Sequence, residues 1–305
     1  MKLLRLRKQE SEEQKLREIL RKVRKLDIST RKIVQEVISG QYHSVFRGRG
    51  MDFSEVREYQ PGDDVRSIDW NVTARMRRPY VKLYEEEREL TVVIAADMSR
   101  SSAFGTRNEI KREMAVEIAA LLAFSAIENS DLVGLLMFTD RVEKFVPPKK
   151  GKQHTLRLIR ELLAFEAKHT HTDIASAFEY LYRLLKRSSI VFVISDFLDE
   201  NISKSLMLMA KKHDLIPIVV SDPAEIKFEG SGVVVLEDAE TGEVVAVDTS
   251  DPDVYKQFSR DTNSEIERQK KLFGTIGIEP IYISTDTDYV KALELFFKKR
   301  KLKFR

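Results

Sequence analysis

Three oxygen-bearing side chains stand at alternate positions directly after an apolar, strand-length run. The run 91–96 ends at Asp97, and Ser99 and Ser101 lie two and four residues further on. In an extended segment, side chains at i, i+2 and i+4 point to the same side while the intervening ones point away. Carboxylate and hydroxyl oxygens are the hard ligands that Mg²⁺ and Mn²⁺ take in proteins. The segment therefore predicts a hard-cation site where a buried strand ends.

Two later residues can complete such a ligand set. Thr170 would add a third hydroxyl, and Asp196, which closely follows the apolar run 190–194, would add a second carboxylate. Two carboxylates nearly neutralise a divalent ion, and neutral hydroxyl ligands leave it electrophilic enough to take a carboxylate from a partner. This set predicts a metal-dependent binding module rather than an enzyme.

The loop that carries the third hydroxyl reads His169-Thr170-His171-Thr172-Asp173, so either threonine could be the ligand. We prefer Thr170, because Thr172 is well placed to cap the helix that begins at Asp173. A threonine in the cap position accepts a hydrogen bond from a free N–H of the first helical turn.

An alternation of strands and helices, beginning at residue 91, must position these residues. Apolar, β-branched runs predict strands at 91–96, 131–138, 190–195, 215–220 and 279–284. Helical periodicity predicts helices at 107–129, 153–165, 173–187, 200–212, 252–274 and 287–300. This alternation is typical of an α/β fold, a mostly parallel sheet with helices on both faces. Ligands of such sheets bind at the carboxyl ends of the strands, where Asp97 and Asp196 both fall.

Two further regions are expected outside this alternation. Apolar residues at helical spacing predict a helix over 8–38, and an extended Arg-, Gly- and Asp-rich segment follows it. Within the body, two β-rich runs around Ala239-Glu-Thr-Gly242 predict a β-hairpin insertion near 226–250. We therefore expect an N-terminal region, 1–89, that packs on an α/β domain, 90–305.

The segment 43–89 concentrates arginines and carboxylates. A second cation site over Gly62–Trp70 is one interpretation. We favour instead ion pairs that hold this segment on the body, formed by Asp63, Asp64 and Asp69 with Arg57, Arg66 and Arg75. Arg47 and Arg49 alternate with Gly48 and Gly50, a pattern that resembles an anion-binding loop. The residues of this partner-binding or structural network are Arg47, Arg49, Arg57, Asp63, Asp64, Arg66 and Asp69. Trp70, the only tryptophan, is expected in the core.

Composition narrows the class of protein. The chain has 305 residues and no cysteine, which excludes disulfides, thiolate metal sites and cysteine nucleophiles. No apolar window reaches the length of about 18 residues that a membrane span needs, and the N-terminal residues lack the apolar core of a signal peptide. We therefore expect a cytoplasmic protein. The first 50 residues carry 14 Lys and Arg against 6 Asp and Glu, and the last 15 carry 7 against 1.

The motifs resemble known proteins at two levels. The ligand set that begins with Asp97-x-Ser99-x-Ser101 looks like the metal-ion-dependent adhesion site of von Willebrand factor A domains. The upstream segment resembles the bacterial family known as domain of unknown function 58. That resemblance implies a von Willebrand factor A-like (Rossmann-type) domain and association with MoxR-type AAA+ ATPases in the maturation or assembly of other proteins. The segments that carry it are His43–Gly50, Arg57–Arg66 and Ile68–Asn71.

The expected function is thus a non-catalytic module that binds an acidic protein ligand through Mg²⁺ or Mn²⁺ and partners a MoxR-type ATPase. A metal-dependent phosphohydrolase is one alternative, because an aspartate after a strand can act as a nucleophile. Haloacid-dehalogenase-type phosphatases need a second aspartate two residues later, and here that position is Ser99. Nucleic-acid binding through the basic ends is the other alternative, but the N-terminal helix lacks interleaved aromatic residues. We therefore expect no nucleic acid.

Overall fold

The computed structural model describes residues 52–85, 89–103, 111–199, 202–226, 232–237, 244–249 and 251–303, together with positions 21, 33 and 34. The chain forms two compact units. One is Phe46–Leu90, and the other contains Thr91–Arg305. The helix predicted over 8–38 lies outside the described residues, those three positions apart. No helix in the described part of the chain is long and apolar enough to cross a membrane.

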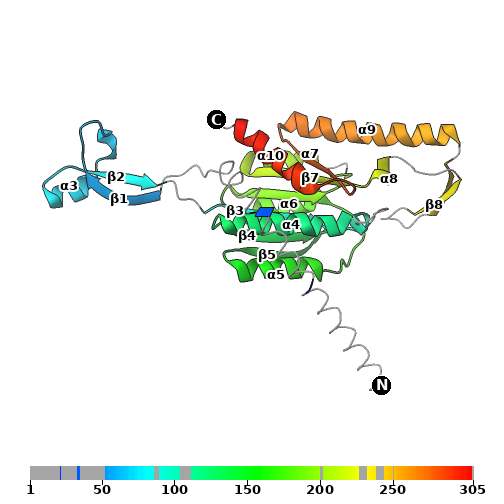
Figure 1. Cartoon of the computed structure of the whole chain (residues 1–305), viewed down its shortest axis with the longest axis horizontal. Helices are drawn as coiled ribbons and strands as arrows, with labels where there is room; N and C mark the ends of the chain where they lie inside the picture. Colours follow the sequence, from blue (N-terminus) through cyan, green and yellow to red (C-terminus); the bar gives the residue numbers. More distant parts are fainter. Residues whose placement is uncertain are drawn as a thin grey trace, which may run out of the picture. The chain divides into compact units, whose positions relative to one another are not determined.

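The larger unit is built around a six-stranded sheet (Figure 1). Its strands are β3 (Thr91–Asp97), β4 (Leu132–Phe138), β5 (Val142–Lys149), β6 (Ile190–Ser195), β7 (Asp214–Ser221) and β10 (Ile281–Ser284). They lie in the order β10-β7-β6-β3-β4-β5, and all neighbours are parallel except β4 and β5. The central strands are apolar on both faces, as strands covered on both sides by helices must be.

Helices cover both faces of this sheet. They are α4 (Lys111–Glu128), α5 (Lys152–Leu163), α6 (Ile174–Leu184), α7 (Ser203–Lys212), α8 (Pro223–Ile226), α9 (Pro252–Ile276) and α10 (Tyr289–Lys303). Residues of α6, α7 and α9 share one core with the sheet face that includes Val93 and Val191. The opposite face is covered by α4, which contacts β3 and β4 and packs against α5. The predicted α/β fold and the order of its elements are confirmed.

The strand β5 is not among the predicted strands, and it contains Pro147 and Pro148, which a central strand excludes. The strand lies at the edge of the sheet, antiparallel to β4, where a missing N–H is tolerated. Gly134 on β4 makes room for it, since a Cβ built there would lie 2.9 Å from Cγ of Pro148. The close approach of the two strands therefore depends on this glycine.

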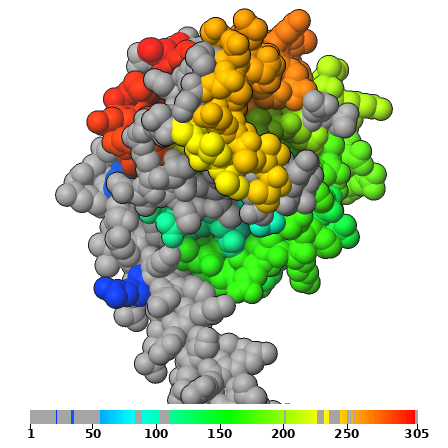
Figure 2. Space-filling view, turned by 90° about the vertical axis from the view of Figure 1, so that its right-hand side faces the viewer, coloured from blue at the N-terminus to red at the C-terminus, as the bar shows by residue number. Residues whose placement is uncertain are grey.

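The predicted hairpin insertion consists of β8 (Val233–Glu237) and β9 (Val244–Asp248), an antiparallel pair that forms a sheet of its own. Its valines are largely exposed, with Val233 at 69% and Val235 at 66%. Figure 2 shows the hairpin, in yellow, on the surface beside the start of α9. An isolated two-stranded ribbon buries little and is marginally stable by itself.

The smaller unit pairs β1 (Asp52–Glu58) with β2 (Tyr80–Glu85) in an antiparallel ribbon. Between these strands lie η2 (Val65–Ser67), a 3-10 helix, and α3 (Trp70–Met76). Asp69 caps α3 by accepting hydrogen bonds from the N–H groups of Asn71 and Val72. Trp70 is 67% exposed, so its predicted place in the core is wrong. As the first residue of a short helix in a small unit, it has no core to enter.

Candidate metal centre

The two predicted carboxylates lie where the strand order reverses. From β3 the chain moves outward to β4 on one side of the sheet and later to β6 on the other. Parallel pairing sets Ala96 opposite Ile194, so Asp97 ends β3 beside Ser195, and Asp196 comes next. Open α/β sheets bind their ligands outside the strand ends at such a switch point.

The Asp-x-Ser-x-Ser segment folds back on itself directly after β3. Asp97 Oδ1 accepts a hydrogen bond from the backbone N–H of Ser99 at 2.9 Å, and the hydroxyl oxygens of Ser99 and Ser101 lie 3.0 Å apart. The turn is supplied by η3 (Arg100–Ala103). Two adjacent ligands of an octahedral Mg²⁺, each at about 2.1 Å from the ion, also lie about 3.0 Å apart. The spacing thus suits both a hydroxyl–hydroxyl hydrogen bond and a shared ion.

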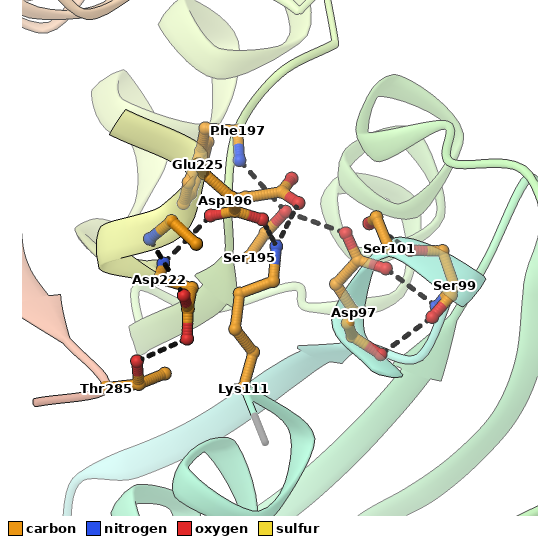
Figure 3. A network of polar contacts seen from close by, with 12 residues as sticks. Asp97, Ser99, Ser101, Lys111, Ser195, Asp196, Phe197, Asp222, Glu225 and Thr285 are labelled. Atoms are coloured by element: carbon orange, nitrogen blue, oxygen red, sulfur yellow. Dashed lines mark hydrogen bonds and ion pairs between the residues drawn. The ribbon is translucent and has the colours of Figure 1, made fainter. Parts of the chain in front are cut away.

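The second carboxylate oxygen of Asp97 is held by the neighbouring strand. Ser195 Oγ donates to Asp97 Oδ2 at 2.7 Å and accepts from the Phe197 N–H at 3.2 Å (Figure 3). Burial, and then the nearby charge of Asp196, raise the pKa of Asp97 to about 6, although hydrogen bonds from Ser99 and Ser195 favour its charged form. A carboxylate whose charge is destabilised in this way gains stability when a cation approaches.

A small cavity of about 20 Å³ lies between these groups. Its polar wall includes Asp97, Ser101 and Asp196, and its apolar wall comes from β6, β7 and α4. A cavity of this size holds about one water molecule or one ion. The cavity therefore has room for an ion.

A lysine outside the predicted ligand set also reaches this cavity. Lys111, at the start of α4, is 3% exposed, and its Nζ lies 3.1 Å from Asp196 Oδ2 and 2.6 Å from Glu225 Oε1. Burial works against its ammonium, but the charges of Asp196 and Glu225 and their hydrogen bonds together raise the pKa of Lys111 above its ordinary value. Its partners are 85 and 114 residues away in the chain, which is why no local pattern reveals it.

The choice between the two threonines changes once the loop is seen. The N-cap of α6 is Asp173, whose side chain accepts from the N–H of Ser176, so the predicted capping role of Thr172 is wrong. Thr172 Oγ1 is buried and has no hydrogen-bond partner in the described part of the chain. The side chain of Thr170 is exposed, while its carbonyl accepts from the N–H of Arg100. The loop therefore contacts η3 through the Thr170 carbonyl, and the Thr172 hydroxyl is buried while the side chain of Thr170 is exposed.

The donor set fits a hard divalent ion. It offers two carboxylates and serine hydroxyls, and no sulfur or imidazole ligand, which is the oxygen chemistry of Mg²⁺ and Mn²⁺. Within the described residues, no group of three His, Asp or Glu side chains converges as a metal cluster would. A tightly chelating site of many carboxylates is thus not formed there, and an ion would depend on the hydroxyls.

In the small unit, one predicted arginine–carboxylate pair forms, and the other predicted carboxylates have different partners. Arg57 and Asp63 form a bidentate pair, with Nη–Oδ distances of 2.7 and 2.8 Å. Asp64 instead accepts from the backbone N–H of Arg66, and Asp69, besides capping α3, lies 3.5 Å from Lys82 Nζ. These contacts lie within the small unit, where they stabilise its turn and helix. The two remaining members of the predicted network, Arg47 and Arg49, lie outside the described residues.

The chain is similar in sequence to uncharacterized bacterial proteins. An uncharacterized protein of Mycobacterium tuberculosis (strain ATCC 25618 / H37Rv), Rv1480, is 31% identical over 282 residues, which are 92% of this chain and 89% of that protein. The uncharacterized protein YeaD of Bacillus subtilis (strain 168) is 28% identical over 109 residues, 36% of this chain and 25% of that protein.

Among solved structures, the conserved hypothetical protein BatB from Bacteroides thetaiotaomicron is 17% identical, with a TM-score of 0.44. The match covers 69% of this chain and 98% of that one, and at this level it bears on neither fold nor function. The family described as protein of unknown function DUF58 matches residues 55–268. Because that match spans more than half of the chain, and Rv1480 aligns along nearly all of it, the chain belongs to the DUF58 family.

Proposed function

We propose that this protein is a non-catalytic, divalent-cation-dependent protein-interaction module with an adhesion site of the von Willebrand factor A type. The observation that carries the proposal is the convergence of Asp97, Asp196 and Ser101 around one ion-sized cavity, with the Ser99 hydroxyl 3.0 Å from that of Ser101. Mg²⁺ or Mn²⁺ would be held by Asp97, Ser99, Ser101, Asp196 and one threonine. We assign that threonine to Thr172, because its hydroxyl is buried without a partner among the described residues.

The bound ion would supply an electrophilic position for a carboxylate of the partner. Neutral hydroxyl ligands add no negative charge to that of the two aspartates, so the ion keeps affinity for another anion. This chemistry selects an acidic segment of a protein. The family resemblance implies that the partner bound through this contact is a MoxR-type AAA+ ATPase.

Catalysis by Asp97 has less support. A nucleophilic carboxylate must be accessible to its substrate. Here Oδ1 accepts from Ser99, Oδ2 accepts from Ser195, and the residue is 4% exposed. The position two residues later, where a phosphatase of the haloacid dehalogenase type needs an acid, is Ser99. The arrangement suits an ion-holding carboxylate better than an attacking one.

The proposal is tested with the full chain as bait. Wild type and Asp97→Asn are each incubated with the purified MoxR-type ATPase, in Mg²⁺ and in EDTA. Asn keeps the size of the side chain and an oxygen for the Ser99 N–H, but it removes the charge. We expect retention of the ATPase by wild type in Mg²⁺ only, and loss of retention by Asp97→Asn in both buffers.

The matched control is Asp140→Asn. Asp140 follows β4, the strand next to β3, but pairs with Arg141 at 2.9 Å on the surface. Its variant should retain the ATPase as wild type does. Retention that is the same in Mg²⁺ and EDTA for all three proteins would refute a metal-bridged contact.

A further inference from the structure

The proposed ion site contains a buried cation of its own. Lys111 lines the same cavity as Asp97 and Asp196, and only 3% of it is exposed. Its ammonium is shared between Asp196 Oδ2, at 3.1 Å, and Glu225 Oε1, at 2.6 Å. Figure 3 shows Lys111 extending from α4 into the group of acidic side chains. A structural lysine in such a place neutralises carboxylates that would otherwise be buried with bare charges.

This contact competes with a divalent ion. Asp196 cannot give the same lone pair to an ammonium and to a metal. Two cations that share one carboxylate also repel each other strongly in a cavity that holds little water. The bond between Lys111 and Asp196 must therefore weaken or break when Asp196 turns to an ion.

Glu225 is fixed as a second acceptor for the lysine. Its Oε2 accepts from the backbone N–H of Asp222 at 2.8 Å, which leaves Oε1 for Lys111. Asp222 is itself fully buried and accepts from the Thr285 hydroxyl at 2.7 Å. Glu225 thus stays in place, anchored to the ends of β7 and β10, whether or not Lys111 keeps Asp196.

We propose that Lys111 is the resident cation of this site, which neutralises Asp196 when no divalent ion is bound and passes to Glu225 alone when one binds. This inference rests on the proposed function of the site. The exchange makes Lys111 a residue that lowers the affinity for the ion, and it makes Glu225 a residue that raises it. The site would then bind its ion reversibly instead of holding it permanently.

The inference is tested by calorimetric titration of the metal-free full chain with MnCl₂ and with MgCl₂. The variants are Lys111→Met, which keeps the length of the side chain, and Glu225→Gln, which keeps its shape. Removal of a cation beside the ion should tighten binding by at least about tenfold. Glu225→Gln should weaken binding by a similar factor, because Lys111 then has only Asp196 as a charged partner. Lys144→Met, which removes an exposed lysine paired with Glu161, should bind as wild type does.

Thermal unfolding provides a second measurement. In EDTA, Lys111→Met leaves the partly buried Asp196 and Glu225 without their cation, so its melting temperature should fall by roughly 5–10 °C. A saturating divalent ion should restore most of that loss, which gives Lys111→Met a larger ion-induced shift than wild type. A lysine that only fills space would lower the melting temperature equally with and without the ion.

The two proposals fail in different ways. If wild type, Lys111→Met and Glu225→Gln all fail to bind Mn²⁺ and Mg²⁺, the ion site is refuted. The proposed role of Lys111 as its resident cation is then refuted as well. If wild type binds an ion but Lys111→Met binds it equally well or more weakly, the adhesion-site proposal stands and the resident-cation inference is overturned. Tighter ion binding by Lys111→Met together with weaker ion binding by Glu225→Gln supports both the ion site and the role of Lys111.

Discussion

Ser195 and Asp97 join the two strands that flank the switch point of the sheet, because the Ser195 hydroxyl donates to Asp97 Oδ2 at 2.7 Å. The same oxygen of Ser195 accepts from the N–H of Phe197, so it orders both the carboxylate and the turn that follows β6. Asp97 is thereby oriented before any ligand arrives.

Ser195→Ala should therefore destabilise the protein by about 1.5–3 kcal/mol, the range for a hydrogen bond to a charged group. Urea unfolding at pH 7.5 measures this free energy. The matched control is Ser125→Ala, since Ser125 is also fully buried but donates only to the Leu121 carbonyl in its own helix. If Ser125→Ala lowers the free energy of unfolding as much as Ser195→Ala does, the hydrogen bond to Asp97 contributes no more than one within a helix.

His213 should make the protein sensitive to acid. The residue is 4% exposed, and neither ring nitrogen has a hydrogen-bond partner among the described residues. Burial, and then the charge of Lys212, lower the pKa of His213 from 6.5 to about 4. Between these values the unfolded chain binds the proton and the folded chain does not, so stability is lost as the pH falls. The slope is about 1.4 kcal/mol per pH unit.

The measurement is the free energy of unfolding from pH 7.5 to pH 4.5, for wild type and His213→Leu. Asp97 contributes with the opposite sign, because its folded pKa of about 6 lies above its ordinary 3.8 and the folded state binds the proton first. The difference between the two proteins isolates His213. If wild type and His213→Leu lose stability in parallel, His213 is not the source.

Gly134 and Gly274 should respond oppositely to alanine. A Cβ on Gly134 would lie 2.9 Å from Pro148 Cγ and 3.0 Å from its backbone nitrogen, so Gly134→Ala should cost about 1–3 kcal/mol by forcing β4 and β5 apart. A Cβ on Gly274, in α9, meets nothing within 4 Å, so Gly274→Ala should stabilise by about 0.5–1 kcal/mol. Thermal unfolding ranks the two variants against wild type. Equal shifts of the melting temperature in the two variants would mean that β4 and β5 accommodate the added methyl group without strain.

The exposed hairpin should contribute little to the stability of the body. Val235 in β8 is 66% exposed and Val193 in β6 is fully buried. Val→Thr adds a hydroxyl, which costs about 1–3 kcal/mol when it is buried without a partner. We expect that cost for Val193→Thr, and a change below about 0.5 kcal/mol for Val235→Thr. A large loss in Val235→Thr, measured by urea unfolding, would show that the hairpin unfolds together with the sheet.

Local sequence determined the strand ends that hold the candidate site. Buried parallel strands are continuous apolar runs, so the first polar residue after such a run marks the carboxyl edge of the sheet. Asp97, Ser99 and Ser101 follow one run, and Asp196 follows another. The edge strand β5 does not share that signal, because an edge position tolerates the prolines that a central strand excludes.

Only the tertiary structure decided what surrounds those residues. Thr172 and Thr170 are separated by one residue, and the structure shows that Asp173 caps α6 while the Thr172 hydroxyl is buried without a partner among the described residues. Lys111 and Glu225 carry no sequence signal, since a lysine at the start of a helix is usually solvated. Side-chain charges interact through space, and a chain of 305 residues brings together groups that are 114 positions apart. The residue types of the candidate site were therefore readable from the sequence, while the lysine that balances their charge was placed by packing.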